Sequence, residues 1–223
     1  EPDGERIISL KGEQHLESIG VIPLPPYIHE TNSDPERYQT VYSKEKGSIA
    51  APTAGLHFTS EMIQRLQGNN VETLFVTLHV GWDTFRPITG RLEEHKMHSE
   101  FWAVDKNSAE RIRLAKDQGR RVIAVGTTVV RLLENAAQIS GDGRLSSGSG
   151  WVDLFIKPGY KFQVVDGLIT NFHLPKSTLM MLVSAFSSRE IILDAYSEAV
   201  RAKYRFFSFG VLFVVQFVTS CIL

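Results

Sequence analysis

Residues 122–134 read VIAVGTTVVRLLE, an apolar run that meets a glycine and two threonines and then continues with helical periodicity. The β-branched residues at 121–125 predict a strand, and the apolar pattern of 128–138 predicts a helix. A strand that leads directly into a helix is the repeating unit of α/β proteins. This stretch therefore favours the α/β class, and the rest of the chain can be tested against it.

The turn between this strand and helix is a candidate ligand site. Gly126, Thr127 and Thr128 occupy the first turn, where free N–H groups and a partial positive charge can hold an anion. Arg131 lies one turn further on and could bind a carboxylate or phosphate with two hydrogen bonds. The alternative is structural: Thr127 caps the helix and Arg131 pairs with Glu134.

Short β-rich runs alternate with helical runs over most of the chain. Besides the strand at 121–125, strands are predicted at 6–10, 48–51, 71–80, 151–156 and 161–170. Besides the helix at 128–138, helices are predicted at 33–43, 60–67, 107–118 and 189–203, and one more begins at 177 or 178. The prolines of 23–26 predict an extended linker. Alternation of this kind indicates an α/β domain with a largely parallel sheet.

Composition narrows the function classes. The chain has 223 residues, of which 43% are hydrophobic and 22% charged, as in ordinary globular proteins. The formal net charge of −1 gives no overall attraction to a polyanion, although a local basic patch remains compatible with it. Cys221 is the single cysteine, which excludes a disulfide or a cysteine-rich zinc site within the chain and indicates a reducing compartment.

The two ends are unusual. The chain begins abruptly at Glu1 with no leader sequence, which suggests a fragment. Residues 211–223 read VLFVVQFVTSCIL, shorter than the roughly 20 apolar residues that a membrane-spanning helix needs. A buried strand, an aggregation-prone tail or a mistranslated end fits this segment better than a membrane anchor.

Polar residues follow further predicted strands, at the sheet edge where α/β proteins bind ligands. The segments are APTAGLHF (51–58), LHVGWDTFRP (78–87) and LITNFHLP (168–175). They supply the candidates His57, His79, Gly81, Asp83, Thr84, Arg86, Asn171 and His173, with Phe58, Trp82, Phe85 and Phe172 beside them. Most such aromatic residues belong to a core, but one beside a cationic ligand would stabilise it.

A further segment, EEHKMHSEFW (93–102), holds His98 and Glu100. On a strand these two residues share a face and could act as a base and its orienting partner; the alternative is a solvated charged turn. Metal-ligand spacings such as HExxH are absent. Convergence of His57, His79 and His98 in space stays open at this point, and with it a histidine-centred metal-dependent hydrolase.

Seven motifs together closely resemble the S-adenosylmethionine:tRNA ribosyltransferase-isomerase family of queuosine biosynthesis. They are YQTVYS (38–43), APTAGLHF, FVTLHVGWDTFRPI (75–88), MHSE (97–100), VIAVGTTVVRLLE, DLFIKPGYKFQVVDGLITNFHLPKSTLMMLVSAF (153–186) and KYRFFSFG (203–210). They occur in the family's order and cover residues from about 20 to 210. Three departures are a shorter N-terminal part, Trp82 and Asp83 in place of small residues, and Val211 in place of an acid.

The resemblance implies a fold, an organisation and a reaction. The fold is a partly open, largely parallel sheet or barrel domain with helices at 26–210, preceded by the remnant of an inserted β-barrel domain and linker at 1–25 and followed by an atypical tail at 211–223. The reaction transfers and isomerises the ribosyl group of S-adenosylmethionine onto 7-aminomethyl-7-deazaguanine in tRNA, giving epoxyqueuosine and releasing adenine and methionine. No metal or other cofactor is implied, and we expect a cytoplasmic monomer that does not bind membranes.

The reaction needs a base beside the sulfonium, a donor to the leaving adenine and a partner for the methionine carboxylate. The resemblance implies the catalytic residues His98, Glu100, His57, His79 and His173, and the substrate-binding residues Gly55, Phe58, Gly81, Thr84, Gly126, Thr127, Thr128, Arg131 and Asn171. His98 or Glu100 would be the base and His57 or His79 the donor. We expect His57, His79, His98, Arg131 and His173 to meet at the rim of one cavity.

Two questions remain open from the sequence. The chain could be an inactive truncated fragment that keeps only part of the fold. Contacts to tRNA phosphates could come from Arg120 and Arg121, or from Arg201, Lys203 and Arg205, or these residues could form ordinary solvated charged faces.

Overall fold

The computed structural model describes residues 35–81, 95 and 97–216, together with isolated residues before them (9, 11, 12, 15, 20, 24, 25 and 28). The predicted strand at 6–10, the barrel remnant at 1–25, Thr84 and Cys221 therefore lie wholly or largely outside the described residues. The strands are β1 (Thr77–His79), β2 (Glu100–Val104), β3 (Ile123–Val125), β4 (Gly148–Val152), β5 (Gly167–Asn171) and β6 (Leu212–Gln216). The α-helices are α2 (Ser60–Gly68), α3 (Lys106–Asp117), α4 (Thr127–Ser140), α5 (Thr178–Phe186) and α6 (Arg189–Arg201), and two 3₁₀ helices are η2 (Pro35–Tyr38) and η3 (Thr53–His57).

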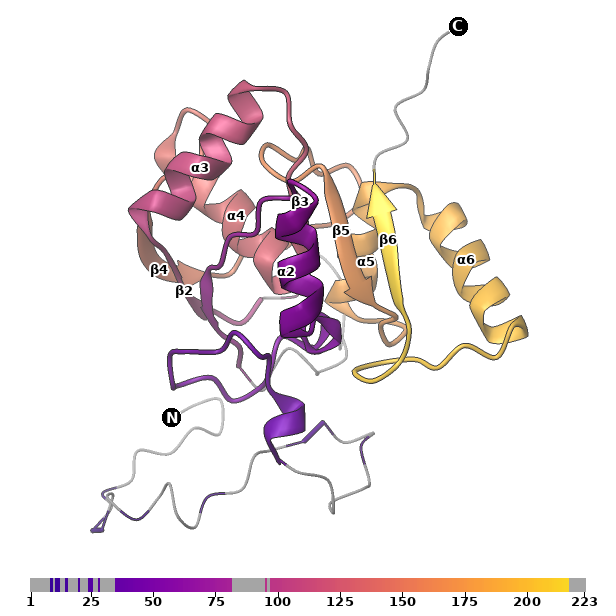
Figure 1. Ribbon diagram of the computed structural model, residues 1–223. Coiled ribbons are helices and arrows are strands. Elements are labelled where there is room, and N and C mark those ends of the chain that lie inside the picture. Colours follow the sequence, from indigo (N-terminus) through magenta and orange to yellow (C-terminus); the bar gives the residue numbers. More distant parts are fainter. Residues whose placement is uncertain are drawn as a thin grey trace, which may run out of the picture.

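The described strands form two three-stranded sheets, in the orders β1-β2-β4 and β3-β5-β6 (Figure 1). The first sheet is antiparallel throughout, and in the second only β3 and β5 run parallel. The α/β class is confirmed, but the predicted largely parallel sheet is wrong for the described residues. Alternation along the chain does not determine pairing: β3 lies between β2 and β4 in sequence, yet it joins the other sheet.

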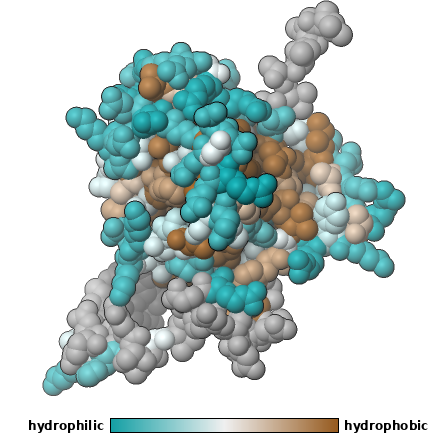
Figure 2. Space-filling model, viewed as in Figure 1, coloured by the Kyte–Doolittle hydropathy of each residue, from teal (hydrophilic) through white to brown (hydrophobic). Residues whose placement is uncertain are grey.

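Helix α4 holds the two sheets together. It contacts β4 and β1 of the first sheet and β3 and β5 of the second. Val130, Leu132 and Ala137 of α4 are fully buried in a single apolar core that also contains Leu168 of β5 and Val183 of α5. The outer face of the β3-β5-β6 sheet is apolar and exposed beside α2 (Figure 2).

The helix boundaries follow from capping residues. Side chains at four N-caps accept a hydrogen bond from a backbone N–H of the first turn: Thr59, Asp105, Ser177 and Ser188. Gly119 follows α3 with φ +68°, a conformation that glycine adopts without strain. The predicted helices at 60–67, 107–118, 128–138 and 189–203 and the helix start at Ser177 or Thr178 are confirmed to within two residues.

Several predicted elements are shorter or absent for identifiable reasons. The predicted helix at 33–43 is wrong, since only Pro35–Tyr38 forms a 3₁₀ turn. The strand predicted at 48–51 is a single bridge between Ala50 and Val80. The strand predicted at 71–80 is reduced to β1, because its partner β2 ends at Val104 and Asp105 then caps α3.

The two strands predicted at 151–156 and 161–170 also have different bounds in the structure. β4 begins at Gly148 rather than at 151, and it ends at Val152 rather than at 156. β5 begins at Gly167 rather than at 161, since the backbone N–H groups of 163–165 donate to a side chain of α4 instead of to a strand.

Residues 212–216 of the apolar tail form β6, which pairs antiparallel with β5. Phe213 packs on Phe172 with ring centroids 4.7 Å apart, and Val215 is buried. This part of the tail therefore belongs to the sheet. Within the described part of the chain, none of the helices combines the length and the apolar character needed to cross a membrane.

Candidate functional site

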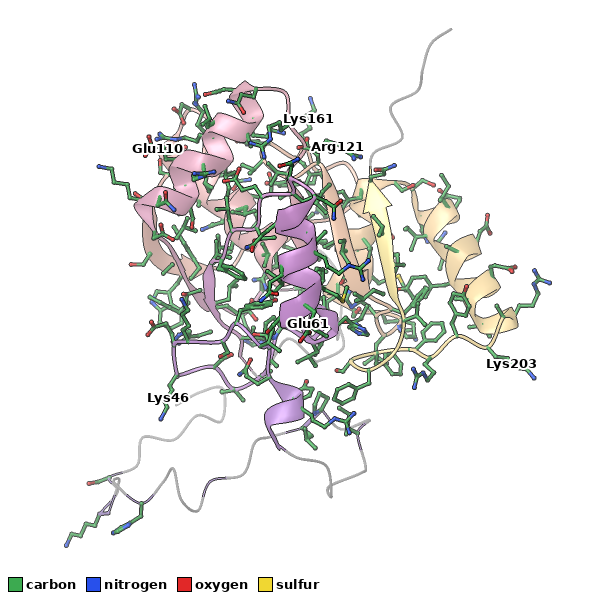
Figure 3. The ribbon with its side chains drawn as sticks, in the orientation of Figure 1. Lys46, Glu61, Glu110, Arg121, Lys161 and Lys203 are labelled. Atoms are coloured by element: carbon green, nitrogen blue, oxygen red, sulfur yellow. The ribbon has the colours of Figure 1, made fainter. Side chains whose placement is uncertain are left out.

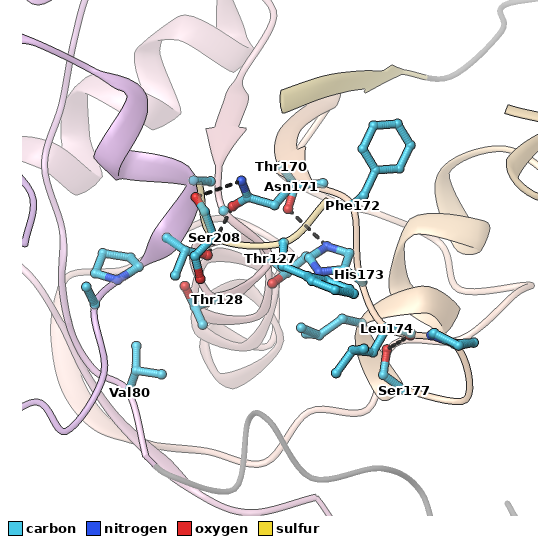
Figure 4. A pocket seen from close by; sticks show the side chains of 18 residues that line it. Val80, Thr127, Thr128, Thr170, Asn171, Phe172, His173, Leu174, Ser177 and Ser208 are labelled. Atoms are coloured by element: carbon cyan, nitrogen blue, oxygen red, sulfur yellow. Dashed lines mark hydrogen bonds between the residues drawn. The ribbon is translucent and has the colours of Figure 1, made fainter. Parts of the chain in front are cut away.

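A pocket opens at the carboxyl ends of the parallel strands β3 and β5, where α/β proteins place their ligands (Figure 4). Its walls are residues 51–54, Val80, 126–128, 170–175, Ser177, Leu179, Phe207 and Ser208. Its volume is about 80 Å³, well below the roughly 300–1,000 Å³ of pockets that enclose a drug-sized ligand. The described walls therefore receive only part of such a molecule.

The N-terminus of α4 forms one wall. Gly126 has φ +97°, which turns the chain from β3 into the helix and favours glycine at this position. Thr127 and Thr128 follow and are nearly buried at 5% and 6% exposure. Gly126 is the N-cap and no side chain caps this helix, so the predicted capping role of Thr127 is wrong. The free N–H groups of this turn are available to an anion.

Asn171, at the end of β5, connects three segments of the pocket wall. Its Oδ1 accepts a hydrogen bond from Thr53 Oγ1 at 3.0 Å, and its Nδ2 donates to the carbonyl of Ser208 at 3.4 Å. Nδ2 also lies 3.2 Å from Nε2 of His57. With Nδ2 as donor, His57 accepts on Nε2 and carries its proton on Nδ1. Asn171 thus fixes both η3 and the segment around Ser208.

His173 lies in the pocket wall two residues after Asn171. Its Nε2 is 3.0 Å from Thr170 Oγ1, and its backbone N–H donates to the hydroxyl of Tyr196 at 2.8 Å. Burial lowers the pKa of His173 from its ordinary value near 6.5 to about 3, and burial raises the pKa of Tyr196 to about 12. The imidazole is therefore neutral at neutral pH and a very weak base, so it is suited to hydrogen bonding rather than to proton abstraction.

The lowered pKa of His173 predicts a pH-dependent stability. Between pH 6.5 and 3 the unfolded chain binds a proton that the folded chain does not, so stability falls as pH falls. From pH 6.5 to 5 we expect the free energy of unfolding to decrease by up to about 1.4 kcal/mol per pH unit more in the wild type than in His173→Gln. Urea denaturation at several pH values measures this difference. An NMR titration that places the imidazole pKa near 6.5 would contradict it.

Arg131 and Glu100 lie outside the pocket and bind each other. Arg131 Nη1 is 2.7 Å from Glu100 Oε2, and both side chains are at most 4% exposed. Arg131 also donates to the carbonyls of His98, Val152 and Leu154. Burial lowers the pKa of the Arg131 guanidinium, while Glu100 opposes this shift. Arg131 therefore ties α4 to the first sheet, and the predicted pairing of Arg131 with Glu134 is wrong.

The other candidate residues are distributed over several surroundings. His79 packs edge-on against Phe101, with ring centroids 5.4 Å apart, in the first sheet. His98 has an exposed side chain. Phe58 lines a different, apolar groove beside α2. Of the five side chains expected to meet, His173 lines the described pocket and His57 is hydrogen-bonded to its wall. His79, His98 and Arg131 are not among its wall residues.

The predicted glycines have different surroundings. A Cβ on Gly55 would collide with Tyr42 and Thr40, so Gly55 serves the packing of η3. A Cβ on Gly81 would meet no atom of the described residues within 4 Å. Among the described residues, no group of three His, Cys, Asp or Glu side chains is placed to hold a metal ion.

Several wall residues are not among those predicted from the sequence. Thr53 and Thr170 bond to Asn171 and His173, and Phe207 and Ser208 close the far side of the pocket. Thr53 and Ser208 lie within the motifs APTAGLHF and KYRFFSFG, which supplied the resemblance. The motifs contained the signal, but no local pattern showed that these segments meet.

A pocket at the ends of two parallel strands, with a helix N-terminus in its wall, defines an α/β ligand-binding protein. The chain belongs to the queuosine biosynthesis protein family, whose sequence model matches residues 1–215.

Individual relatives agree with this assignment. The chain is 59% identical over 199 residues to the S-adenosylmethionine:tRNA ribosyltransferase-isomerase of Carboxydothermus hydrogenoformans, covering 89% of this chain and 58% of that protein. It is 54% identical over 214 residues to the protein of the same name from Natranaerobius thermophilus, covering 94% and 62%. The chain thus spans less than two thirds of the length of these relatives. The crystal structure of S-adenosylmethionine tRNA ribosyltransferase from Thermotoga maritima matches with a TM-score of 0.59 and 41% identity, over 74% of this chain and 51% of that one.

Proposed function

We propose that this chain carries the S-adenosylmethionine-binding part of a tRNA ribosyltransferase-isomerase. The reaction moves the ribosyl group of S-adenosylmethionine onto 7-aminomethyl-7-deazaguanine in tRNA and releases adenine and methionine. The observation that carries the proposal is the α4 N-terminus at the ends of β3 and β5, in a chain of this family. S-adenosylmethionine is itself the substrate, so the proposal requires no metal or other cofactor, and we propose that the chain acts as a monomer.

The methionine carboxylate is the part of the ligand that this pocket suits. The wall residues of the described pocket are neutral, with His173 as their single titratable side chain, so the charge that favours an anion comes from the α4 dipole. The hydroxyls of Thr127 and Thr128 and the free N–H groups beside them can complete the contacts to a carboxylate. Arg131 is excluded from this role because its guanidinium is engaged by Glu100 and three carbonyls.

The base and the donor to adenine complete the proposal. Of the two base candidates, Glu100 is bound to Arg131, so we assign the base to His98. His98 lies two residues before the start of β2 and is not a wall residue of the described pocket, so the ligand must extend past the pocket to reach it. His57, protonated on Nδ1 and oriented by Asn171, is assigned as the donor to adenine.

Placing the methionine carboxylate at the α4 N-terminus predicts different affinities for S-adenosylmethionine and 5′-methylthioadenosine. 5′-Methylthioadenosine keeps the nucleoside and lacks the amino-acid portion. We expect it to bind this chain about tenfold more weakly than S-adenosylmethionine, a loss of about 1.4 kcal/mol. Isothermal titration calorimetry measures both affinities, and Thr128→Val should reduce the difference between them. Equal affinities would remove the carboxylate from the α4 N-terminus.

The activity itself is tested by incubating the chain with S-adenosylmethionine and tRNA that carries the deazaguanine base. Chromatography of released adenine, with a mixture lacking tRNA as control, reports transfer. Ligand binding without adenine release would support the truncated-fragment alternative, in which this chain keeps the binding site alone.

A further inference from the structure

The segment after α6 presents cations and aromatic rings to solvent. In residues 203–209, here named the rim loop, the side chains of Lys203 and Arg205 are exposed, and Tyr204 and Phe209 are 52% and 43% exposed. Tyr38 of η2 packs edge-on against Phe209 with ring centroids 6.0 Å apart. Large exposed aromatic residues that alternate with cations are typical of surfaces that bind single-stranded nucleic acid.

The rim loop is anchored directly to the pocket. Phe206 turns inward and packs on Phe172 and Tyr196, with ring centroids 4.7 and 6.0 Å apart. Phe207 and Ser208 line the pocket, and the Ser208 carbonyl accepts from Asn171. A molecule bound along the exposed side of the loop therefore lies at the mouth of the pocket.

Lys203 occupies a backbone position that is unusual for lysine. It follows α6 with φ +56°, and its N–H donates to the carbonyl of Val200. Helices commonly end with glycine or asparagine in this left-handed conformation, because other side chains are strained there. Asn70 and Gly119 occupy the corresponding positions after α2 and α3. Since glycine would relieve this backbone strain, the lysine points to a function of its side chain.

The charge of the rim loop is less compensated than that of the other basic surface. At the end of α3, Arg120 and Arg111 share Glu72 and Lys116 pairs with Asp166, whereas Arg121 donates to the neutral amide of Gln216. Arg201 of α6 pairs with Glu198, but among the described residues Lys203 and Arg205 have no carboxylate within ion-pair distance. Figure 3 shows Arg121 in the upper part of the view and Lys203 well apart from it, at the lower right.

We propose that the rim loop binds the single-stranded loop of the RNA substrate, with Lys203 and Arg205 on phosphates and Tyr204 and Phe209 stacked on bases. The proposal rests on the proposed function and adds to it the surface that receives the RNA. Unpaired loop bases can be splayed onto aromatic side chains, so one of them can reach the mouth of the pocket while its neighbours remain on the rim loop. The candidate contacts at Arg120 and Arg121 lie at the other end of the sheet and are not part of this surface.

The test measures binding of an RNA hairpin with the sequence of a tRNA anticodon arm, by fluorescence anisotropy at several salt concentrations. Removing both cations, Lys203→Ala with Arg205→Ala, should weaken binding at least tenfold. It should also reduce the slope of log K against log salt by about 1.4, since each single-strand phosphate contact contributes about 0.7. Tyr204→Ala should weaken binding about tenfold with little change in slope. The matched controls are Arg113→Ala with Arg121→Ala, and the exposed Trp151→Ala, each expected to change affinity less than twofold.

A single substitution separates function from folding. Lys203→Gly should raise the melting temperature, because glycine relieves the left-handed strain, and should weaken RNA binding. Unchanged RNA affinity in Lys203→Gly and in the double variant, or equal losses in the controls, would overturn the proposal. S-adenosylmethionine binding and adenine release are measured separately: RNA binding that depends on the rim loop in a chain that neither binds S-adenosylmethionine nor releases adenine would refute the proposed function and leave this surface standing.

Discussion

Replacing Arg131 with alanine is expected to lower the free energy of unfolding by about 3–5 kcal/mol, because it leaves Glu100 buried without its partner. The carboxylate of Glu100 is 3% exposed and lies 2.7 Å from the guanidinium. The substitution also removes the donors to three backbone carbonyls, those of His98, Val152 and Leu154, where α4 meets the first sheet. Urea denaturation monitored by circular dichroism measures the loss.

A double variant shows whether the unpaired charge or the lost packing causes the loss of stability in Arg131→Ala. Arg131→Met combined with Glu100→Leu removes both charges and keeps apolar volume, so it should be more stable than Arg131→Ala alone. A loss below about 1 kcal/mol in Arg131→Ala would contradict the buried pair. If Arg131 instead held a ligand carboxylate, its removal would abolish S-adenosylmethionine binding while leaving stability nearly unchanged.

Replacing Glu134 with alanine is expected to lower the free energy of unfolding by at least about 2 kcal/mol, since the buried backbone donors of Val164 and Val165 lose their acceptor at a cost of about 1–3 kcal/mol each. Glu134 lies on α4 and is fully buried. Its carboxylate accepts hydrogen bonds from the N–H groups of Gln163, Val164 and Val165 at 2.8–3.0 Å. The Tyr160 hydroxyl also donates to it, and burial together with this carboxylate raises the pKa of Tyr160.

Hydrogen exchange reports this effect residue by residue. The amides of 163–165 should exchange much faster in Glu134→Ala than in the wild type under conditions where both are folded. Glu110→Ala, an exposed glutamate on α3, is the matched control and should change neither stability nor exchange appreciably. Unchanged protection of 163–165 would show that another group satisfies these donors.

Apart from the wrong helix at 33–43, the α-helices could be predicted from the sequence, and the sheets largely could not. Capping residues such as Thr59 and Ser188 fix a helix start through a contact three residues away, which a local pattern records. Strand pairing depends on partners far along the chain. The β-branched run at 71–76 stays unpaired because β2 ends at Val104, and residues 163–165 bond to Glu134 on another element.

The location of the pocket could be predicted better than the side chains that line it. Polar turns after β3 and β5 do meet at one pocket, as the rule for parallel strands requires. Which side chains enter it depends on the face of each element. His79 lies on a strand next to Val80, and because neighbouring strand residues point to opposite faces, Val80 lines the pocket while His79 packs on Phe101.

Helix α4 makes three separate sets of contacts at fixed intervals along its axis: the pocket wall at Thr127 and Thr128, the ion pair at Arg131 and the acceptor for backbone N–H groups at Glu134. Adding or deleting one residue between them would rotate everything beyond it by about 100°. Each set of contacts tolerates some change of side chain, yet none tolerates a shift of the residue's position around the helix. Insertions and deletions during the evolution of such chains should therefore accumulate in surface turns such as 141–147 and be purged from this helix.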